Sequence, residues 1–200
     1  MTLKLAASPG AFSVHLANLL ALQRLEEPDT QILLEEVSPC ARFQDLSDGR
    51  YNLSIAWTAL TESGLATQPL WREELALAVP ARSPLLAHAA ITPQALQHYP
   101  VIQTESASNP HMEALLTQID RSPQKTTSFE LLAVLVAAGY GIGIAPRALI
   151  EQVRHWGITL RPFAGGPFVI QAQLHWPASK REPAADRFAK RAARIAAGSA

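Results

Sequence analysis

The sequence predicts an α/β protein built from two Rossmann-like subdomains. Apolar segments with a period of two alternate with amphipathic helical segments along the 200 residues, with short connections between them, as is typical of parallel sheets flanked by helices. This alternation occurs twice, before and after one long extended segment at residues 70–80. A second long strand at residues 168–176 can return the chain to the first lobe. We therefore expect two lobes joined by two crossing strands, with a ligand cleft between them.

The first lobe opens with a strand at residues 2–7, where leucines alternate with other residues. The turn Ser8-Pro9-Gly10 leads into a helix with an apolar face, for which Ser8 is the expected N-cap and Pro9 a first-turn residue. The other elements expected in this lobe are strands at residues 30–37 and 52–57, a helix from Ser38-Pro39 to Gly49, and a closing amphipathic helix at residues 183–197.

The second lobe repeats the pattern. Thr127 and Glu130 have capping-box spacing at the start of a helix that begins near Ser128. The other expected elements are helices at residues 91–99, 109–119 and 147–156, and strands at residues 100–105, around Lys125, at 141–146 and near Ile158. The expected boundaries are residues 1–76 with 176–200 for subdomain I, and residues 77–175 for subdomain II.

Composition excludes several classes of protein. Lys and Arg number 17, as do Asp and Glu, so net charge does not steer the chain towards nucleic acid or a lipid surface. The single cysteine, Cys40, cannot form an intrachain disulfide, and we interpret it as a loop residue rather than a reactive thiol. The N-terminus lacks the pattern of a signal peptide, and no apolar run is long enough to cross a bilayer. We expect a cytoplasmic protein without membrane contact.

Three spaced glycines occur in the segment LLAVLVAAGYGIGIAPRAL, residues 131–149. A phosphate-binding loop needs its glycines after a strand and before a helix. Here a helical segment comes first, Gly139 follows it at the position that favours a left-handed backbone, and Pro146 begins the next helix. We interpret the segment as a helix-to-strand junction, in which Gly141 and Gly143 allow a backbone or a ligand to approach one face of the strand.

With this order, the segment resembles the effector-binding (substrate-binding) domain of LysR-type transcriptional regulators. Asn52 stands where that family usually has aspartate, and Ser83 where histidine is common before Pro84. The resemblance covers the whole chain and implies a fold like that of type II periplasmic binding proteins. The other segments that carry it, in the family's order, are LKLAASPGAF, EEPDTQILLEE, LSDGRYNLSIAW, EELALAVPARSPLL and PAADRFAKRA.

In this family, small molecules lie between the lobes, held by hydroxyls and backbone amides near helix starts. The expected effector is a small organic anion, with a carboxylate as its expected charged group. A doubly charged ligand is disfavoured because no arginine falls in the matched loops. No cofactor or metal is expected. On the first lobe, the resemblance places effector contacts at Ser8, Pro9, Gly10, Ala11, Trp57 and Thr58. On the second lobe, the expected contacts are Gln103, Thr104, Glu105, Ser106, Ser128, Phe129, Gly143 and Ile144.

The resemblance also implies an effector-sensing regulatory domain that controls DNA binding and transcription. The family's winged helix-turn-helix is not found in this chain, so we expect DNA contact only through a missing N-terminal domain. Family domains pair side by side as homodimers or homotetramers, and the candidate interface comprises Leu19, Leu22 and the strand from Gln31. The serious alternative is the solute-binding protein of a transporter. An enzyme is not expected, because the six histidines are scattered and neither HExxH nor GxSxG occurs.

Overall fold

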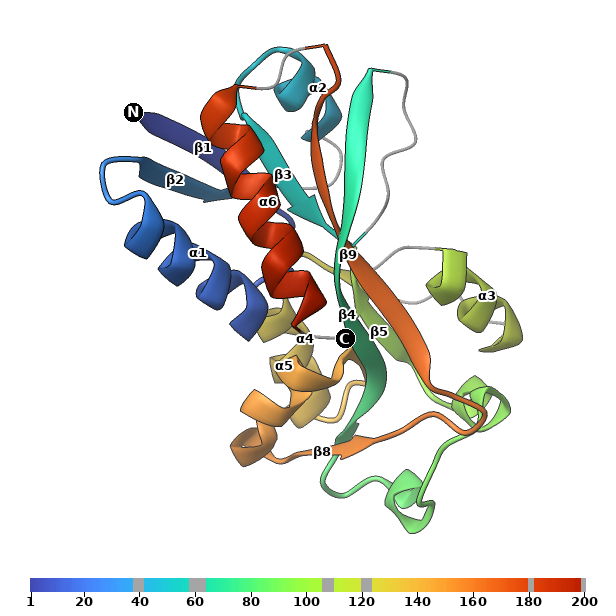
Figure 1. Ribbon diagram of the computed structural model, residues 1–200. Coiled ribbons are helices and arrows are strands. Elements are labelled where there is room, and N and C mark those ends of the chain that lie inside the picture. Colours follow the sequence, from blue (N-terminus) through green and yellow to red (C-terminus); the bar gives the residue numbers. More distant parts are fainter. Residues whose placement is uncertain (38–41, 58–63, 106–109, 120–123, 180–181, 199–200) are drawn as a thin grey trace. The chain divides into compact units, whose positions relative to one another are not determined.

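The computed structural model describes residues 1–37, 42–57, 64–105, 110–119, 124–179 and 182–198 (Figure 1). The chain divides into two compact units, Met1–Arg72 with Gln171–Ala200 (unit 1) and Glu73–Ile170 (unit 2). Two long strands, β4 (Leu65–Pro80) and β9 (Phe168–Pro177), each have residues in both units. The expected pair of crossing strands is therefore confirmed, although β4 begins five residues before the segment that the sequence predicts.

Unit 1 is built on a mixed sheet. Strand β1 (Thr2–Ala7) is parallel to β2 (Gln31–Glu36) and to β3 (Leu53–Ala56), and β3 is antiparallel to β9. The helices of this unit are α1 (Val14–Glu26), α2 (Arg42–Ser47) and α6 (Pro183–Ala197). Figure 1 shows α1 and α6 packed side by side.

The first helix begins later than the sequence predicts. Its N-cap is Ser13, whose Oγ accepts a hydrogen bond from Leu16 N at 3.4 Å, and not Ser8. Gly10 has φ of +79°, a left-handed conformation that interrupts any helix started at Pro9. Residues 8–13 therefore form a turn, and the chain enters α1 only after Ser13.

In the described part of unit 2, strands lie in the order β8-β4-β7-β5-β6, formed by β4 with β5 (Val101–Thr104), β6 (Gln124–Thr126), β7 (Ile142–Pro146) and β8 (Ile158–Arg161). Strands β5, β6 and β7 are mutually parallel, whereas β4 is antiparallel to β7 and β8. The helices are α3 (Pro110–Ile119), α4 (Phe129–Ala137) and α5 (Arg147–Gln152). The glycine-rich segment is a helix-to-strand junction, as predicted: α4 ends, Gly139 has φ of +84°, and β7 follows.

Two predicted helices of unit 2 differ in detail from those in the structure. Residues Pro93–His98 form a 3₁₀-helix, because Pro93 and Pro100 leave too few residues between them for a stable α-helix. The segment 147–156 is divided into α5 and a 3₁₀ turn at Arg154–Trp156, which ends at Gly157 with φ of +84°. A further 3₁₀ turn, Pro84–Ala87, was not predicted.

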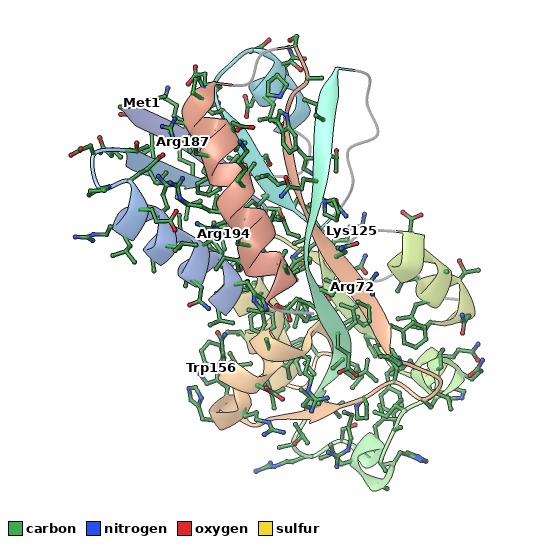
Figure 2. The ribbon with its side chains drawn as sticks, in the orientation of Figure 1. Met1, Arg72, Lys125, Trp156, Arg187 and Arg194 are labelled. Atoms are coloured by element: carbon green, nitrogen blue, oxygen red, sulfur yellow. The ribbon has the colours of Figure 1, made fainter. Side chains whose placement is uncertain are left out.

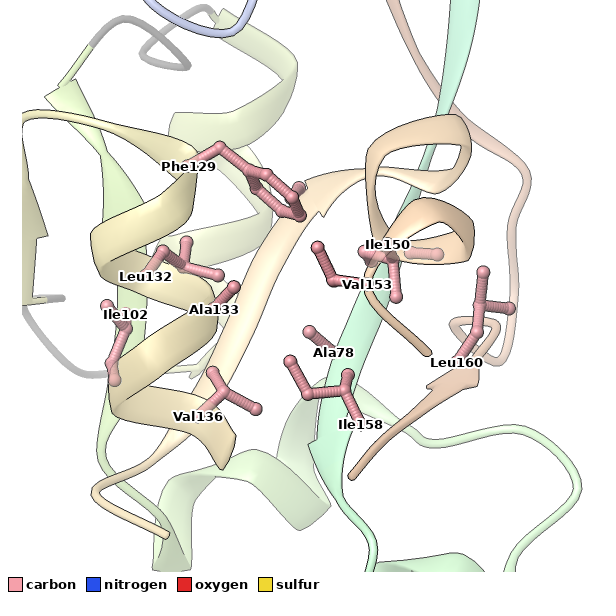
Figure 3. Close-up of a cluster of buried hydrophobic side chains, with 12 residues drawn as sticks. Ala78, Ile102, Phe129, Leu132, Ala133, Val136, Ile150, Val153, Ile158 and Leu160 are labelled. Atoms are coloured by element: carbon pink, nitrogen blue, oxygen red, sulfur yellow. The ribbon is translucent and has the colours of Figure 1, made fainter. Parts of the chain in front are cut away.

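The apolar core of unit 2 lies between α4, α5 and one face of the sheet (Figure 3). Ile102 of β5 and Ala78 of β4 face Leu132 and Val136 of α4 there. Because successive residues of a strand point to opposite faces, these contacts fix which residues of β4, β5 and β7 face the other way. The buried members of the cluster are Ala76, Ala78, Ile102, Phe129, Leu132, Ala133, Val136, Ala145, Ile150, Val153, Ile158 and Leu160.

A polar cluster joins α1 to α6 in unit 1. The side chain of Arg191 is 8% exposed, and its guanidinium donates to three acceptors, Glu26 Oε2 at 2.7 Å, Gln23 Oε1 at 3.1 Å and Glu27 Oε1 at 3.2 Å. Two further arginines of α6, Arg187 and Arg194, pair with the same two glutamates (Figure 2). These ion pairs join α6 to α1, and removing one member of a buried pair leaves an uncompensated charge. The cluster therefore fixes the position of α6 on α1.

The acid stability of the domain should depend on this cluster. Burial favours the neutral form of Glu27, but hydrogen bonds from Arg187, Gln23 and Arg191 outweigh it and lower the pKa of Glu27 from 4.5 to about 2. The ionised carboxylate therefore stabilises the fold above pH 4.5, and this contribution is lost as the pH falls towards 2. In urea unfolding between pH 6 and pH 3, we expect the Glu27→Gln variant to start less stable and to lose less stability than the unsubstituted domain.

The matched control is Glu36→Gln, at an exposed glutamate of β2. Parallel pH profiles for the unsubstituted domain and Glu27→Gln would contradict the role of Glu27.

Candidate functional site

The first-lobe candidates lie in the turn after β1 and at the end of β3. Ser8 is fully buried, and its backbone N–H donates to Ile55 O at 2.9 Å. Ala11 N donates to Ser8 O at 3.0 Å, so two of the amides expected to hold a ligand are already bonded, one to β3 and one within the turn. The hydroxyl of Ser8 is buried and has no hydrogen-bond partner among the described residues. Trp57 follows β3 and is 4% exposed.

The second-lobe candidates lie on both faces of the unit 2 sheet. Gly143 faces α4, since a Cβ built on it would lie 2.6 Å from Leu132 Cδ2 and 3.1 Å from Val136 Cγ2. Phe129 packs in the same apolar cluster (Figure 3). The close approach that Gly143 permits is thus made by side chains of α4. We leave Gly143 and Phe129 out of the site that we propose below.

The opposite face of the sheet carries a row of four residues in register. Leu77 of β4 pairs with Ile144 of β7, Ile144 pairs with Gln103 of β5, and Gln103 pairs with Lys125 of β6. Neighbours in register point to the same face of a sheet. The row therefore changes from buried aliphatic side chains to the buried amide of Gln103 and then to the exposed Lys125. This places Gln103 at the border between the core and the exposed edge.

Thr104 and Ser128 lie where β5 ends and α4 begins. Ser128 is the N-cap of α4 and accepts from Leu131 N at 3.2 Å, which replaces the predicted capping box of Thr127 and Glu130. A buried threonine of β6, Thr126, ties the two segments together, because its hydroxyl contacts Gln103 O at 3.3 Å and Ser128 O at 3.2 Å. Thr104, 6% exposed, pairs in register with Thr126.

Three further site residues predicted from the sequence are Thr58, Ser106 and Glu105. Thr58 and Ser106 lie outside the described residues. Glu105 follows β5 and is exposed. In unit 2, the candidates that gather at the carboxyl ends of β5 and β6 are thus Gln103, Thr104 and Ser128, with Ile144 beside Gln103.

Lys125 was missed as a site residue by the sequence analysis, which used it only to mark a strand. Its place beside Gln103 follows from the register of β5 and β6. A basic residue in a short strand just before a capped helix is the signal that sequence alone offers. The sequence alone does not identify Gln103 as the residue that pairs with Lys125.

Neither a metal site nor a membrane span emerges from the described segments. They contain no group of three or more His, Cys, Asp or Glu side chains placed to hold a metal ion. Within the same residues, no helix has the length and apolar character required to span a bilayer.

The sequence matches one protein family, described as the LysR substrate binding domain, over residues 1–196. The chain belongs to this family. No curated protein sequence matches it. The family shows that the chain is an effector-sensing domain of LysR-type transcriptional regulators, and it decides against the solute-binding protein of a transporter. Its members are regulatory domains rather than enzymes.

Solved structures with the same fold come from this family. The effector binding domain of QuiR in complex with shikimate aligns with a TM-score of 0.87 at 19% identity, covering 99% of this chain and 98% of that one. A reduced form of OxyR from N. meningitidis aligns with a TM-score of 0.82 at 22% identity, covering 98% and 95%. Full-length BenM, as its E226K mutant, aligns with a TM-score of 0.82 at 19% identity, covering 99% of this chain and 68% of BenM. The predicted type II periplasmic-binding-protein-like fold is confirmed.

The packing role of Gly143 gives a direct prediction. In Gly143→Ala, the new methyl group overlaps the side chain of Leu132, a fully buried residue of α4. Overpacking of this kind typically destabilises a core by about 1–3 kcal/mol. We expect a loss of this size in the free energy of unfolding, measured with urea.

Gly198→Ala is the control, because its Cβ would meet nothing closer than 3.7 Å. A Gly143→Ala domain as stable as this control would mean that α4 does not approach β7 as closely as described.

Proposed function

We propose that the chain senses a small organic anion with a single carboxylate, and that the binding site includes the row of Gln103 and Lys125. The observation that supports this most strongly is the position of a lysine next to a buried amide whose oxygen is unpaired, at the carboxyl ends of parallel strands. Ligands of α/β proteins gather at this edge. The residues proposed for unit 2 are Gln103, Thr104, Glu105, Ser106, Lys125, Ser128 and Ile144.

Charge limits the effector to one carboxylate. The start of α4 favours an anion by about 0.3–1 kcal/mol at an exposed position. Lys125 adds one positive charge, whereas the exposed Glu105 beside Thr104 adds a negative one. A second carboxylate would have no cationic partner among these residues.

The proposed contacts of unit 1 are the turn after β1 and the residues after β3. The free hydroxyl of Ser8 can accept or donate a hydrogen bond, and the ring of Trp57 offers an apolar wall. The full set of this unit is Ser8, Pro9, Gly10, Ala11, Trp57 and Thr58.

We also propose that the domain forms a homodimer, or a homotetramer, in a cytoplasmic regulator that reaches DNA through a separate N-terminal domain. Leu19 is removed from the candidate interface because it is fully buried within its own protomer, and Leu22 is only half-exposed. Large apolar side chains that are exposed on α1, β2 and α4 are better candidates. They are Val14, Leu25, Leu33, Leu131 and Val134. We do not propose a catalytic activity for this domain.

A thermal-shift screen against monocarboxylates tests the site. Binders should raise the melting temperature of the unsubstituted domain. We expect Lys125→Gln and Thr104→Ala each to weaken the best binder about tenfold, since a hydrogen bond that involves a charged group is worth about 1.5–3 kcal/mol. Ser8→Ala should also weaken it.

Lys4→Gln is the control, because Lys4 is an exposed lysine of β1 outside the site. The proposed site is wrong if a binder keeps its affinity in the Lys125→Gln, Thr104→Ala and Ser8→Ala variants.

Sedimentation velocity tests the dimer. Leu33 is 40% exposed on β2, and a lysine there would be buried without a partner charge if β2 meets a second copy. We expect a dimer for the unsubstituted domain and a monomer for Leu33→Lys at the same concentration. Gln94→Lys, at an exposed residue of unit 2, should remain dimeric. An unsubstituted domain that is monomeric with and without carboxylate would contradict the proposal.

A further inference from the structure

We infer that the effector carries a hydrogen-bond donor, a hydroxyl or N–H group, in addition to its carboxylate, and that the side-chain amide of Gln103 recognises this donor. The inference rests on the proposed function, since it takes Gln103 to lie in the effector site. It adds the chemical class of the ligand, which we take to be a hydroxy acid or an amino-substituted acid.

The first argument is that the side-chain oxygen of Gln103 is buried and unpaired. The residue is 2% exposed, and its Oε1 has no hydrogen-bond partner among the described residues. Buried polar side-chain atoms are nearly always hydrogen-bonded in folded proteins, so each exception calls for a physical reason. A donor supplied by a ligand is such a reason.

The second argument is that the described residues do not use this side-chain oxygen to hold the fold. The backbone carbonyl of Gln103 accepts from Thr126, but its side-chain Oε1 accepts no hydrogen bond from the described residues. On the β7 side its neighbour in the row is Ile144, which has no polar side-chain atom. On the β6 side its neighbour is Lys125, which is exposed and is not found as a donor to Gln103 Oε1.

Gln23 in unit 1 shows what a structural glutamine looks like in the same protein. It is 1% exposed, about as buried as Gln103. Its Nε2 donates to Glu27 Oε2 at 3.2 Å, and its Oε1 accepts from Arg191 at 3.1 Å. Both Nε2 and Oε1 of this amide have hydrogen-bond partners within the protein, so Gln23 needs no ligand to satisfy it.

The third argument concerns what a carboxylate can offer. An ionised carboxylate has acceptors only, so it can pair with Lys125 or with backbone N–H groups but cannot satisfy Gln103 Oε1. A hydroxyl or an N–H group donates to this oxygen. A site built to bind such a group rejects the analogue that lacks it, because the buried acceptor is then desolvated without a partner. Gln103 therefore gives selectivity, while Lys125 supplies attraction for the charge.

The first experiment needs no ligand. In the ligand-free domain, Gln103→Met replaces an unsatisfied amide by an apolar side chain of similar volume, and we expect the melting temperature to rise. The control Gln23→Met removes a fully paired amide and should lower it. A lower melting temperature for Gln103→Met would overturn the inference, because it would mean that Lys125 or another group already satisfies the amide in the free protein.

The second experiment compares matched acids by isothermal titration. The pairs are shikimate and cyclohex-1-ene-1-carboxylate, lactate and propionate, and 4-hydroxybenzoate and benzoate. We expect the hydroxylated member of at least one pair to bind at least tenfold more tightly, and Gln103→Met to abolish this preference.

Equal affinity within every pair, or a preference that survives Gln103→Met, would overturn the inference while leaving the proposed anion site standing. If none of the six acids binds, both the proposed anion site and the inference fail. Weaker binding of every acid to Lys125→Gln, with the preference for the hydroxylated acid of a pair unchanged, would support separate roles for Gln103 and Lys125.

Discussion

The close packing of α4 on β5 and β7 decides which side chains of the unit 2 sheet face away from this helix. Gly143 lets Leu132 and Val136 approach the sheet, and Ile102 faces the same helix. Since a strand alternates its side chains, Ile144 and Gln103 must then point to the other face. A shift of one residue in β5 would turn Gln103 towards α4 and turn Ile102 to the opposite face of the sheet. The apolar packing therefore specifies the position of the polar group.

The two units hold their helices by different means. In unit 2, α4 is fixed by aliphatic side chains (Figure 3). In unit 1, α6 is rich in alanine, and Arg191 sits among buried alanines while its guanidinium reaches Glu26 and Glu27 of α1. An apolar contact tolerates some sliding, whereas a guanidinium with several directed bonds fixes register as well as distance.

The sequence predicted most of the fold and part of the candidate site. Two local patterns can be recognised without knowledge of tertiary contacts. They are the alternation of strands and helices, and the order in which a helix, Gly139 and a strand follow one another. The true N-cap of α1 was not predictable from local rules, because Ser8 and Ser13 are both good caps and the left-handed turn at Gly10 decides between them. Lys125 could not be recognised as a neighbour of Gln103 because strand register is a tertiary property. Likewise, Gly143 could have met a ligand or a helix, and only the packed structure shows that α4 fills the space.

The comparison of Gln23 with Gln103 separates two uses of the same side chain. Both are buried, but only Gln23 lies where two oppositely charged partners converge on it. A buried amide without partners lowers the stability of the free domain, and it persists only if the surrounding packing holds it and if function benefits. In a regulator, this penalty has a direct use. A ligand that supplies the missing donor relieves it and is bound more tightly, whereas a ligand that merely carries the right charge leaves it in place. A domain with few cations near its site can in this way distinguish acids of equal charge by their hydroxyl groups.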